Sequence, residues 1–176
     1  LKSRKDYYEG GEIPWLLSSE VGQFLIEEVT NNVTEAALAE TSIKWVPRES
    51  VLVAMYGATA GNVGLLNLPV TTNQAVCAIH PHPDHDPRFI YYFFLNAQKD
   101  LIALASGNAQ PNISQQKIKG LDFPCIDKNE QKRIASRLDA FRQQINSYSA
   151  LLGNRQRELN DFTKTLHQTS LRGEAA

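Results

Sequence analysis

The chain has 176 residues, of which 42% are apolar and 21% are charged, and this composition is that of an ordinary globular protein. No apolar run reaches the ~18–20 residues that a membrane-spanning helix needs, and Cys77 and Cys125 make neither a disulfide framework nor a zinc motif. The net charge of -1 divides into -4 over residues 1–126 and +3 over residues 127–176. The acidic charge of residues 1–126 argues against strong sequence-independent binding of nucleic-acid phosphates by this chain alone.

The first half of the chain is rich in strand signals. Runs of β-branched and apolar residues bounded by glycine, proline and polar residues predict short strands. The predicted strands are 13–17, with Pro14 near its edge, 24–29, 51–56, 63–66 and 74–79. One short helix is expected over 33–39, with Thr34 as its N-cap.

A longer helix begins after Asp86, which is suited to the N-cap and is followed by Pro87. Its apolar face is predicted from the helical spacing, and Gly107 is expected to end it. The residues of that face are Ile90, Phe94, Ala97, Leu101 and Leu104. After a polar loop at 108–112, Ser114 is expected to cap one helical turn, and 121–126 is predicted as a last strand. The fold class is therefore mixed α/β (α+β).

The last third of the chain predicts one long helix. Residues 127–171 contain no proline, and Asp127 with Glu130 makes a capping box. Apolar residues recur in steps of four and three, the mark of a coiled-coil seam, with one gap at Arg155. The seam consists of Ile134, Leu138, Phe141, Ile145, Tyr148, Leu152, Leu159, Phe162 and Leu166. A helix of about 45 residues is roughly 65 Å long, so this stripe needs a partner helix from elsewhere, and we expect a dimer or an assembly subunit.

Three sets of residues are candidates for a site. The segment with Gly57, Gly61 and Gly64 lacks the Lys-Ser/Thr of a P-loop, so it is either a hairpin that needs positive φ or a loop that presents Thr59 and Asn62 to a partner. The histidines at 80, 82 and 85 match no known metal spacing and favour a solvated loop over a metal site. Both cysteines lie in strand-like runs, which favours buried free thiols in a reducing cytoplasm over a catalytic cysteine.

Amide side chains cluster at the predicted edges of strands and helices. They are Asn73, Gln74, Gln110, Asn112, Gln115 and Gln116. Asn and Gln can read adenine bidentately in the major groove, although they are also common turn residues. No paired carboxylates, Ser/His/Asp set or nucleophile elbow stands out, so the sequence gives no positive evidence for catalysis.

Several segments together resemble one family, the DNA-sequence specificity subunits of type I restriction-modification systems. The resemblance covers about residues 7–173, and it depends on the order and spacing of the segments more than on any single one. They are GEIPWL at 11–16, YGATAGN at 56–62, TTNQA at 71–75, GNAQPNIS at 107–114, NEQKRIA at 129–135 and LHQTSLRG at 166–173.

The resemblance implies a subunit without catalytic activity. Members carry two target recognition domains, each followed by a long helix, and the helices pair antiparallel as a spacer between two DNA half-sites. They position methyltransferase subunits, which bind S-adenosylmethionine, and direct restriction together with translocase subunits. We expect one recognition domain at 1–126, one helical arm at 127–176, no metal or cofactor on this chain, and a bacterial or archaeal cytoplasm. The chain starts with Leu1 inside the first conserved segment, so it is either a half-subunit that dimerises or a fragment of a longer chain.

The residues expected near double-stranded DNA lie in the two loops and the short helix that follows. They are Thr59, Asn62, Gln74, Gln110 and Asn112, with Lys117 and Lys119 on phosphates. The alternative from another class is a coiled-coil adaptor whose first part binds protein. The acidic charge of residues 1–126 favours this adaptor, whereas the family-like segments favour DNA recognition.

Overall fold

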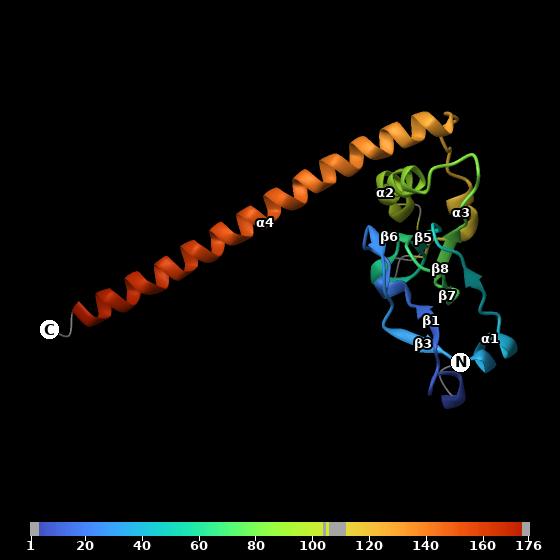
Figure 1. Ribbon diagram of the computed structural model, residues 1–176, viewed down its shortest axis with the longest axis horizontal. Coiled ribbons are helices and arrows are strands. Elements are labelled where there is room, and N and C mark those ends of the chain that lie inside the picture. Colours follow the sequence, from blue (N-terminus) through green and yellow to red (C-terminus); the bar gives the residue numbers. More distant parts are fainter. Residues whose placement is uncertain (1–3, 104, 106–111, 174–176) are drawn as a thin grey trace. The chain divides into compact units, whose positions relative to one another are not determined.

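A computed structural model of the chain describes residues 4–103, 105 and 112–173 (Figure 1). The chain divides into two compact units, one that ends at Ala135 and one that begins at Ser136. The division falls inside the last helix, α4 (Lys128–Gly173), so all described residues of the second unit are helical. The domain boundary predicted after residue 126 stays a prediction.

Within the described residues, eight strands form two four-stranded sheets. The first sheet has the order β3-β1-β7-β4 and contains β1 (Ile13–Leu16), β3 (Asn31–Val33), β4 (Trp45–Val46) and β7 (Val70–Thr72). The second has the order β2-β6-β5-β8 and contains β2 (Leu25–Ile26), β5 (Val51–Ala54), β6 (Val63–Leu66) and β8 (Val76–Ile79). Strand β5 pairs antiparallel with β6 and β8, whereas β1–β7 and β2–β6 are parallel pairs.

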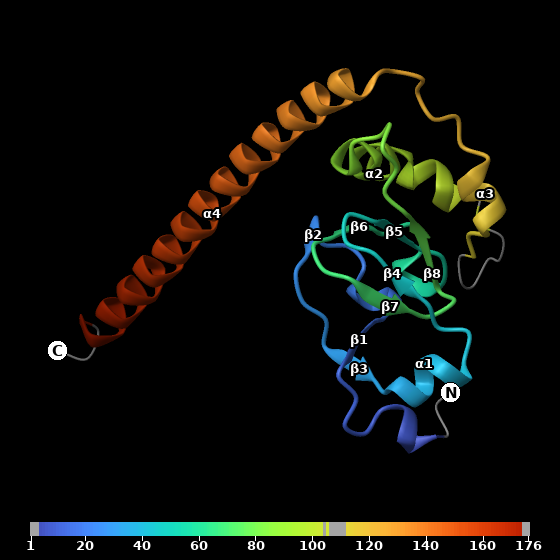
Figure 2. The ribbon, with the colours of Figure 1, turned by 45° about the vertical axis from the view of Figure 1, so that its right-hand side comes forward.

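The first unit has three layers, and β5 lies in the middle one. All four residues of β5 are fully buried, which is why the strand reads as an unbroken apolar run. Leu52 and Ala54 belong to the core between the two sheets, whereas Val51 and Val53 belong to the core under helix α2 (Pro87–Ala103). Figure 2 shows α2 lying along the outer side of the β5–β6 sheet. The predicted mixed α/β class is confirmed.

Three predicted helix N-caps are confirmed by hydrogen bonds. The Thr34 hydroxyl accepts from the Ala37 amide at 3.3 Å at the start of α1 (Glu35–Glu40). The Asp86 carboxylate accepts from the amides of Arg88 and Phe89, 2.9 and 3.2 Å away, at the start of α2. The Ser114 hydroxyl accepts from the Lys117 amide at 3.3 Å and begins α3 (Gln115–Lys119).

On α2, the predicted apolar face is confirmed at Ile90, Phe94, Ala97 and Leu101, which are all buried. Leu104 and Gly107, predicted as the end of this helix, lie outside the described residues. The described part of the first unit also contains three short 3₁₀ helices: η1 (Lys5–Tyr7), η2 (Ser18–Glu20) and η3 (Gly57–Thr59).

The strand predicted over 121–126 is wrong, because this segment is irregular and pairs with no sheet. The aromatic residue of this segment packs against rings of α2 instead. Phe123 lies 5.7 Å from the Phe89 ring and 5.0 Å from the Phe93 ring, both edge-on. Cys125 is exposed, so its predicted burial is also wrong, whereas Cys77 is buried as predicted.

Pairing partners decide which short apolar runs become strands. The strand predicted over 24–29 is reduced to the two residues of β2, and β3, β4 and β7 were not predicted because two or three residues carry no readable alternation. Pro14 is accommodated near the start of β1, where pairing with β7 begins one residue later, at Trp15.

The long helix α4 spans 46 residues, or roughly 69 Å, and confirms the predicted helix. Asp127 caps it, since its carboxylate accepts from the amides of Asn129 and Glu130, 2.9 and 3.1 Å away. The Glu130 carboxylate accepts a hydrogen bond from Arg133 Nε at 2.7 Å. Within the described ranges, no helix combines the length and the apolarity that crossing a membrane requires.

Candidate nucleic-acid interface

The loop between β5 and β6 is a closed hairpin turn. Gly57 and Gly61 have φ values of +73° and +84°, as predicted for this turn, whereas Gly64 has no positive φ. The Gly61 amide donates to the Ala54 carbonyl at 2.8 Å, which closes the loop at its base. Helix η3 fills the loop and holds Thr59 half-buried. The structure of this segment is therefore the predicted hairpin, and contact between Thr59 and a partner stays a prediction.

Three segments of the chain, around residues 55, 75 and 113, meet beside this loop. The Met55 amide donates to the Ala75 carbonyl at 2.8 Å, and the Met55 carbonyl accepts from the Ile113 amide at 2.8 Å. A further antiparallel bridge joins Tyr56 and Asn112. The structure thus brings together residues of two loops that the sequence predicted separately.

Three exposed side chains surround this meeting point. Each belongs to a residue next to one of the hydrogen-bonded residues Met55, Ala75 and Ile113. We call Tyr56, Gln74 and Asn112 the junction face. Tyr56 is 40% exposed, and both amides are exposed. Fully buried Ile113 anchors the segment that carries Asn112. Gln110, the other predicted amide of that loop, lies outside the described residues.

Asn62 has a different environment from the other predicted residues. Its amide nitrogen donates to the Val21 carbonyl at 3.0 Å, and its amide oxygen accepts from Gln98 Nε2 at 3.3 Å. Both ends of the amide therefore hold parts of the first unit together. Contact between Asn62 and DNA stays a prediction.

The two predicted phosphate-binding lysines lie on α3 on either side of Ile118, which is buried. Lys117 is half-buried, and Lys119 is exposed. Burial raises the pKa of the Cys77 thiol, while the charge of Lys119 opposes this effect. A thiol with a raised pKa is mostly protonated at neutral pH, which favours the structural interpretation of Cys77 over a catalytic one.

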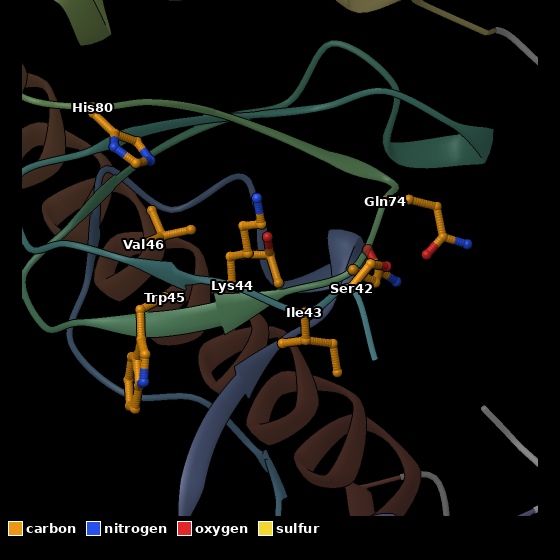
Figure 3. A pocket seen from close by; sticks show the side chains of 9 residues that line it. Ser42, Ile43, Lys44, Trp45, Val46, Gln74 and His80 are labelled. Atoms are coloured by element: carbon orange, nitrogen blue, oxygen red, sulfur yellow. The ribbon is translucent and has the colours of Figure 1, made fainter. Parts of the chain in front are cut away.

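A hollow of about 240 Å³ lies where β4 and β8, the edge strands of the two sheets, approach each other. Figure 3 shows the side chains of Lys44 and Trp45 leaving neighbouring positions of its wall in opposite directions, Lys44 on the side of His80, and it shows His80 and Gln74 at opposite ends of the view. Trp45 is 45% exposed. Gln74 therefore belongs to both the junction face and this hollow, which sequence reasoning missed because its residues come from three separate segments.

The start of α4 contains a buried polar residue that was also missed. Gln131 is fully buried, and its side-chain oxygen accepts from the Asp86 amide at 2.9 Å. Its amide nitrogen donates to the Ile126 carbonyl at 2.9 Å and lies 3.1 Å from His85 Nδ1. Gln131 thus ties the first turn of α4 to the start of α2. The only signal in the sequence was its place in the NEQKRIA segment.

The seam residues of the second unit are exposed in the single chain. They are Leu138, Phe141, Ile145, Tyr148, Leu152, Leu159, Phe162 and Leu166, with exposed fractions between 36% and 69%. Ile134, the remaining seam residue, is half-buried in the first unit. Leu151 is 54% exposed and widens the stripe beside Leu152. At the gap, Arg155 forms an ion pair with Glu158 at 2.9 Å.

The histidine segment forms a loop in which His82 and His85 are ring neighbours at 5.5 Å. In the part of the chain that the structure describes, no group of three or more His, Cys, Asp or Glu residues is arranged to hold a metal ion.

Comparison with known proteins finds one family. The model of the "Type I restriction modification DNA specificity domain" matches residues 1–152. The specificity subunit of the type I restriction enzyme EcoR124I/EcoR124II from Escherichia coli is 28% identical over 151 residues, which is 83% of this chain and 37% of that protein. The MjaIX specificity subunit from Methanocaldococcus jannaschii is 28% identical over 142 residues, 78% of this chain and 32% of that protein.

Two solved structures have a similar fold. A chain from a study of assembly and conformational transition of the type I R-M system superposes with a TM-score of 0.73 over 90% of this chain and 38% of its own, at 18% identity. The HsdS subunit from Thermoanaerobacter tengcongensis gives a TM-score of 0.63 over 81% of this chain and 33% of its own, also at 18% identity. The chain spans about a third of the length of each of these proteins.

Proposed function

Because the chain belongs to the family of type I restriction-modification DNA specificity domains, we propose that it recognises one half of a bipartite DNA target and catalyses no reaction itself. It binds double-stranded DNA through the junction face and the adjoining α3. It has no cofactor of its own, and S-adenosylmethionine binds to the methyltransferase subunits that it positions.

The observation that carries this proposal is the meeting of the two loops at Met55. Backbone hydrogen bonds of 2.8 Å fix Gln74, Tyr56 and Asn112 in place, so their side chains are presented from a rigid base. Amides held in this way can pair with base edges in the major groove. An aromatic ring beside them adds a contact surface for a sugar or a base.

The charge distribution explains how an acidic protein can offer a surface to DNA. The thirteen acidic residues among residues 1–126 are absent from 50–83 and from 101–121, which supply the junction face and α3. Lys117 and Lys119 lie in the second of these stretches. DNA is thus expected to meet a locally neutral to basic surface, with base contacts providing much of the affinity.

The exposed stripe of α4 supports a paired arm. We propose that it pairs with the same helix of a second copy or with an equivalent helix of a longer chain, and that the helix length sets the distance between the two half-sites. The assembly then recruits methyltransferase and restriction subunits in a bacterial or archaeal cytoplasm. Burial of the seam residues on pairing stabilises the paired helices.

The test is DNA binding by the complex reconstituted with its methyltransferase subunits. Sequencing of methylated genomic DNA identifies the target, and fluorescence anisotropy then compares target and random duplexes. Asn112→Ala should cost ~1–3 kcal/mol on the target if a base contact is lost. Asn32→Ala, which removes an exposed amide from β3, is the matched control and should change nothing. Gln110→Ala is measured in the same way, because the sequence predicts that Gln110 lies near the DNA.

Substitutions of the two lysines of α3 test the phosphate contacts. Lys117→Gln and Lys119→Gln should each weaken binding to all sequences alike and lower the salt slope by about one. If the complex binds and methylates its target unchanged after Asn112→Ala and the matching Gln74→Ala, the junction face does not read DNA. If the wild-type complex binds no duplex but residues 1–126 bind a protein, the chain is an adaptor and the proposed DNA recognition is wrong.

A further inference from the structure

The hollow between β4 and β8 has a wall that is fixed by the first sheet. Ile43 and Val46 are buried beneath it, and Trp45 pairs with Thr71 in the first sheet, so the wall that carries Lys44 and Trp45 is fixed. Its volume is about 240 Å³. This space exceeds what a single ion fills.

The chemistry of the lining suits an anion with an attached apolar group. Among the described residues no carboxylate lines the hollow, although residues 1–126 carry a net charge of -4. Lys44 supplies a positive charge, and an N–H group of His80 can donate a hydrogen bond. On the opposite side of the same wall, Trp45 adds a large aromatic surface that is nearly half exposed. A phosphate joined to a sugar combines the two properties that this lining matches.

The position of the hollow favours DNA over a free nucleotide. Gln74 lines one end of the hollow and is also part of the junction face. The Asn73 side chain, by contrast, already accepts a hydrogen bond from the Ala75 amide at 3.0 Å and shapes the turn. A duplex that contacts Gln74 therefore continues directly past Lys44 and Trp45.

We propose that this hollow binds the sugar-phosphate backbone of the DNA beside the recognised bases. Lys44 and His80 hold a phosphate, and Trp45, whose ring points to the opposite side of the wall, packs against a deoxyribose farther along the same backbone. The site positions the duplex on the junction face and carries no sequence information itself. This inference rests on the proposed DNA recognition and adds to it a backbone contact on residues outside the two loops and α3.

The first test is Lys44→Gln in the reconstituted complex, measured by anisotropy over a series of salt concentrations. Loss of one phosphate contact should weaken binding roughly fivefold near 0.15 M salt, for target and random duplex alike, and lower the salt slope by about one. Lys5→Gln is the matched control, because Lys5 is an exposed lysine of η1, with 88% of its side chain exposed, and the change in charge is the same.

The second test follows Trp45 directly. The chain contains two tryptophans, so 5-fluorotryptophan gives two ¹⁹F signals, and Trp15→Phe assigns them. When the labelled chain is assembled with unlabelled methyltransferase, duplex DNA should shift the Trp45 signal, whereas free deoxynucleotide at the same phosphate concentration should not.

The outcomes separate this inference from the proposed function. If the wild-type complex binds its target but Lys44→Gln behaves like Lys5→Gln and the Trp45 signal does not move, the hollow is not a DNA contact and DNA recognition stands. If Lys44→Gln weakens only the target, the residue reads sequence and the backbone role is wrong. If the substitution prevents methyltransferase assembly instead, the hollow is a protein interface. A wild-type complex that binds no duplex overturns the proposed function itself.

Discussion

The two units of the chain place their large apolar side chains in opposite environments. In the unit that ends at Ala135, Leu52 and Leu66 are almost completely buried between two sheets. In the helical unit that begins at Ser136, Ile145 and Leu152 are more than 60% exposed. The first unit therefore contains its own core, whereas the second has an apolar stripe whose burial requires another chain or segment.

The polar residues show the same contrast. Gln131, in the first unit, is completely buried and has hydrogen bonds at both ends of its amide. Arg155, in the second unit, pairs with Glu158 at the surface, where such pairs contribute little to stability. Substitutions in the first unit should thus act on the folding of a single chain, and those in the stripe should act on association.

The largest effect is expected for Ile145→Asp. In a dimer this side chain is buried in both copies, and each large apolar side chain contributes ~1.5–3 kcal/mol when buried. The dissociation constant should rise by more than about a hundredfold, since 1.4 kcal/mol is tenfold. Sedimentation equilibrium at micromolar concentration measures it, with Gln143→Asp on the opposite helix face as the control. A monomeric wild type would contradict this prediction.

Leu52→Ala tests the core of the first unit. Removing a fully buried leucine between the sheets should cost ~2–5 kcal/mol of unfolding free energy. Urea unfolding followed by circular dichroism in the monomeric Ile145→Asp background measures it. In that background, Leu159→Ala should change stability by less than about 0.5 kcal/mol. If Leu52→Ala and Leu159→Ala lowered the unfolding free energy by similar amounts, the contrast between a buried core and an exposed stripe would be wrong.

Gln131→Ala tests the buried amide at the start of α4. Its removal leaves the Asp86 amide and the Ile126 carbonyl without their partner, which should cost ~1–3 kcal/mol. Hydrogen exchange should accelerate in the first turns of α4 and of α2. Gln143→Ala, an exposed amide of the same helix, should leave exchange in those turns unchanged. Unaltered exchange in Gln131→Ala would show that this network does not hold the helix start.

Arg155→Leu is expected to act in the opposite direction and to stabilise the dimer. Burying a leucine at this seam position contributes ~1.5–3 kcal/mol, and losing the surface pair with Glu158 costs ~0.2–1 kcal/mol. The melting temperature of the dimer should rise, while the pairing register becomes less strictly specified. Arg157→Leu, on the opposite face, should not raise it. A large loss of stability would show that Arg155 belongs to a polar network across the interface.

Local signals in the sequence were sufficient for the helices. The caps at Thr34, Asp86, Ser114 and Asp127 are decided by side chains that bond to backbone amides two or three residues away. The 4-3 spacing of α4 depends on helix geometry alone, so it could be read without any tertiary information. The acid-free stretches that form the candidate interface were also visible in the sequence.

Tertiary structure decided the short strands and the site. Strands β3, β4 and β7 exist because their partners lie beside them, and 121–126 is not a strand because rings pack against Phe123 and no strand pairs with it. The junction face joins Tyr56 to Asn112, and the hollow joins Lys44 to His80. These proximities come from pairing between distant segments, which no local propensity or periodicity encodes.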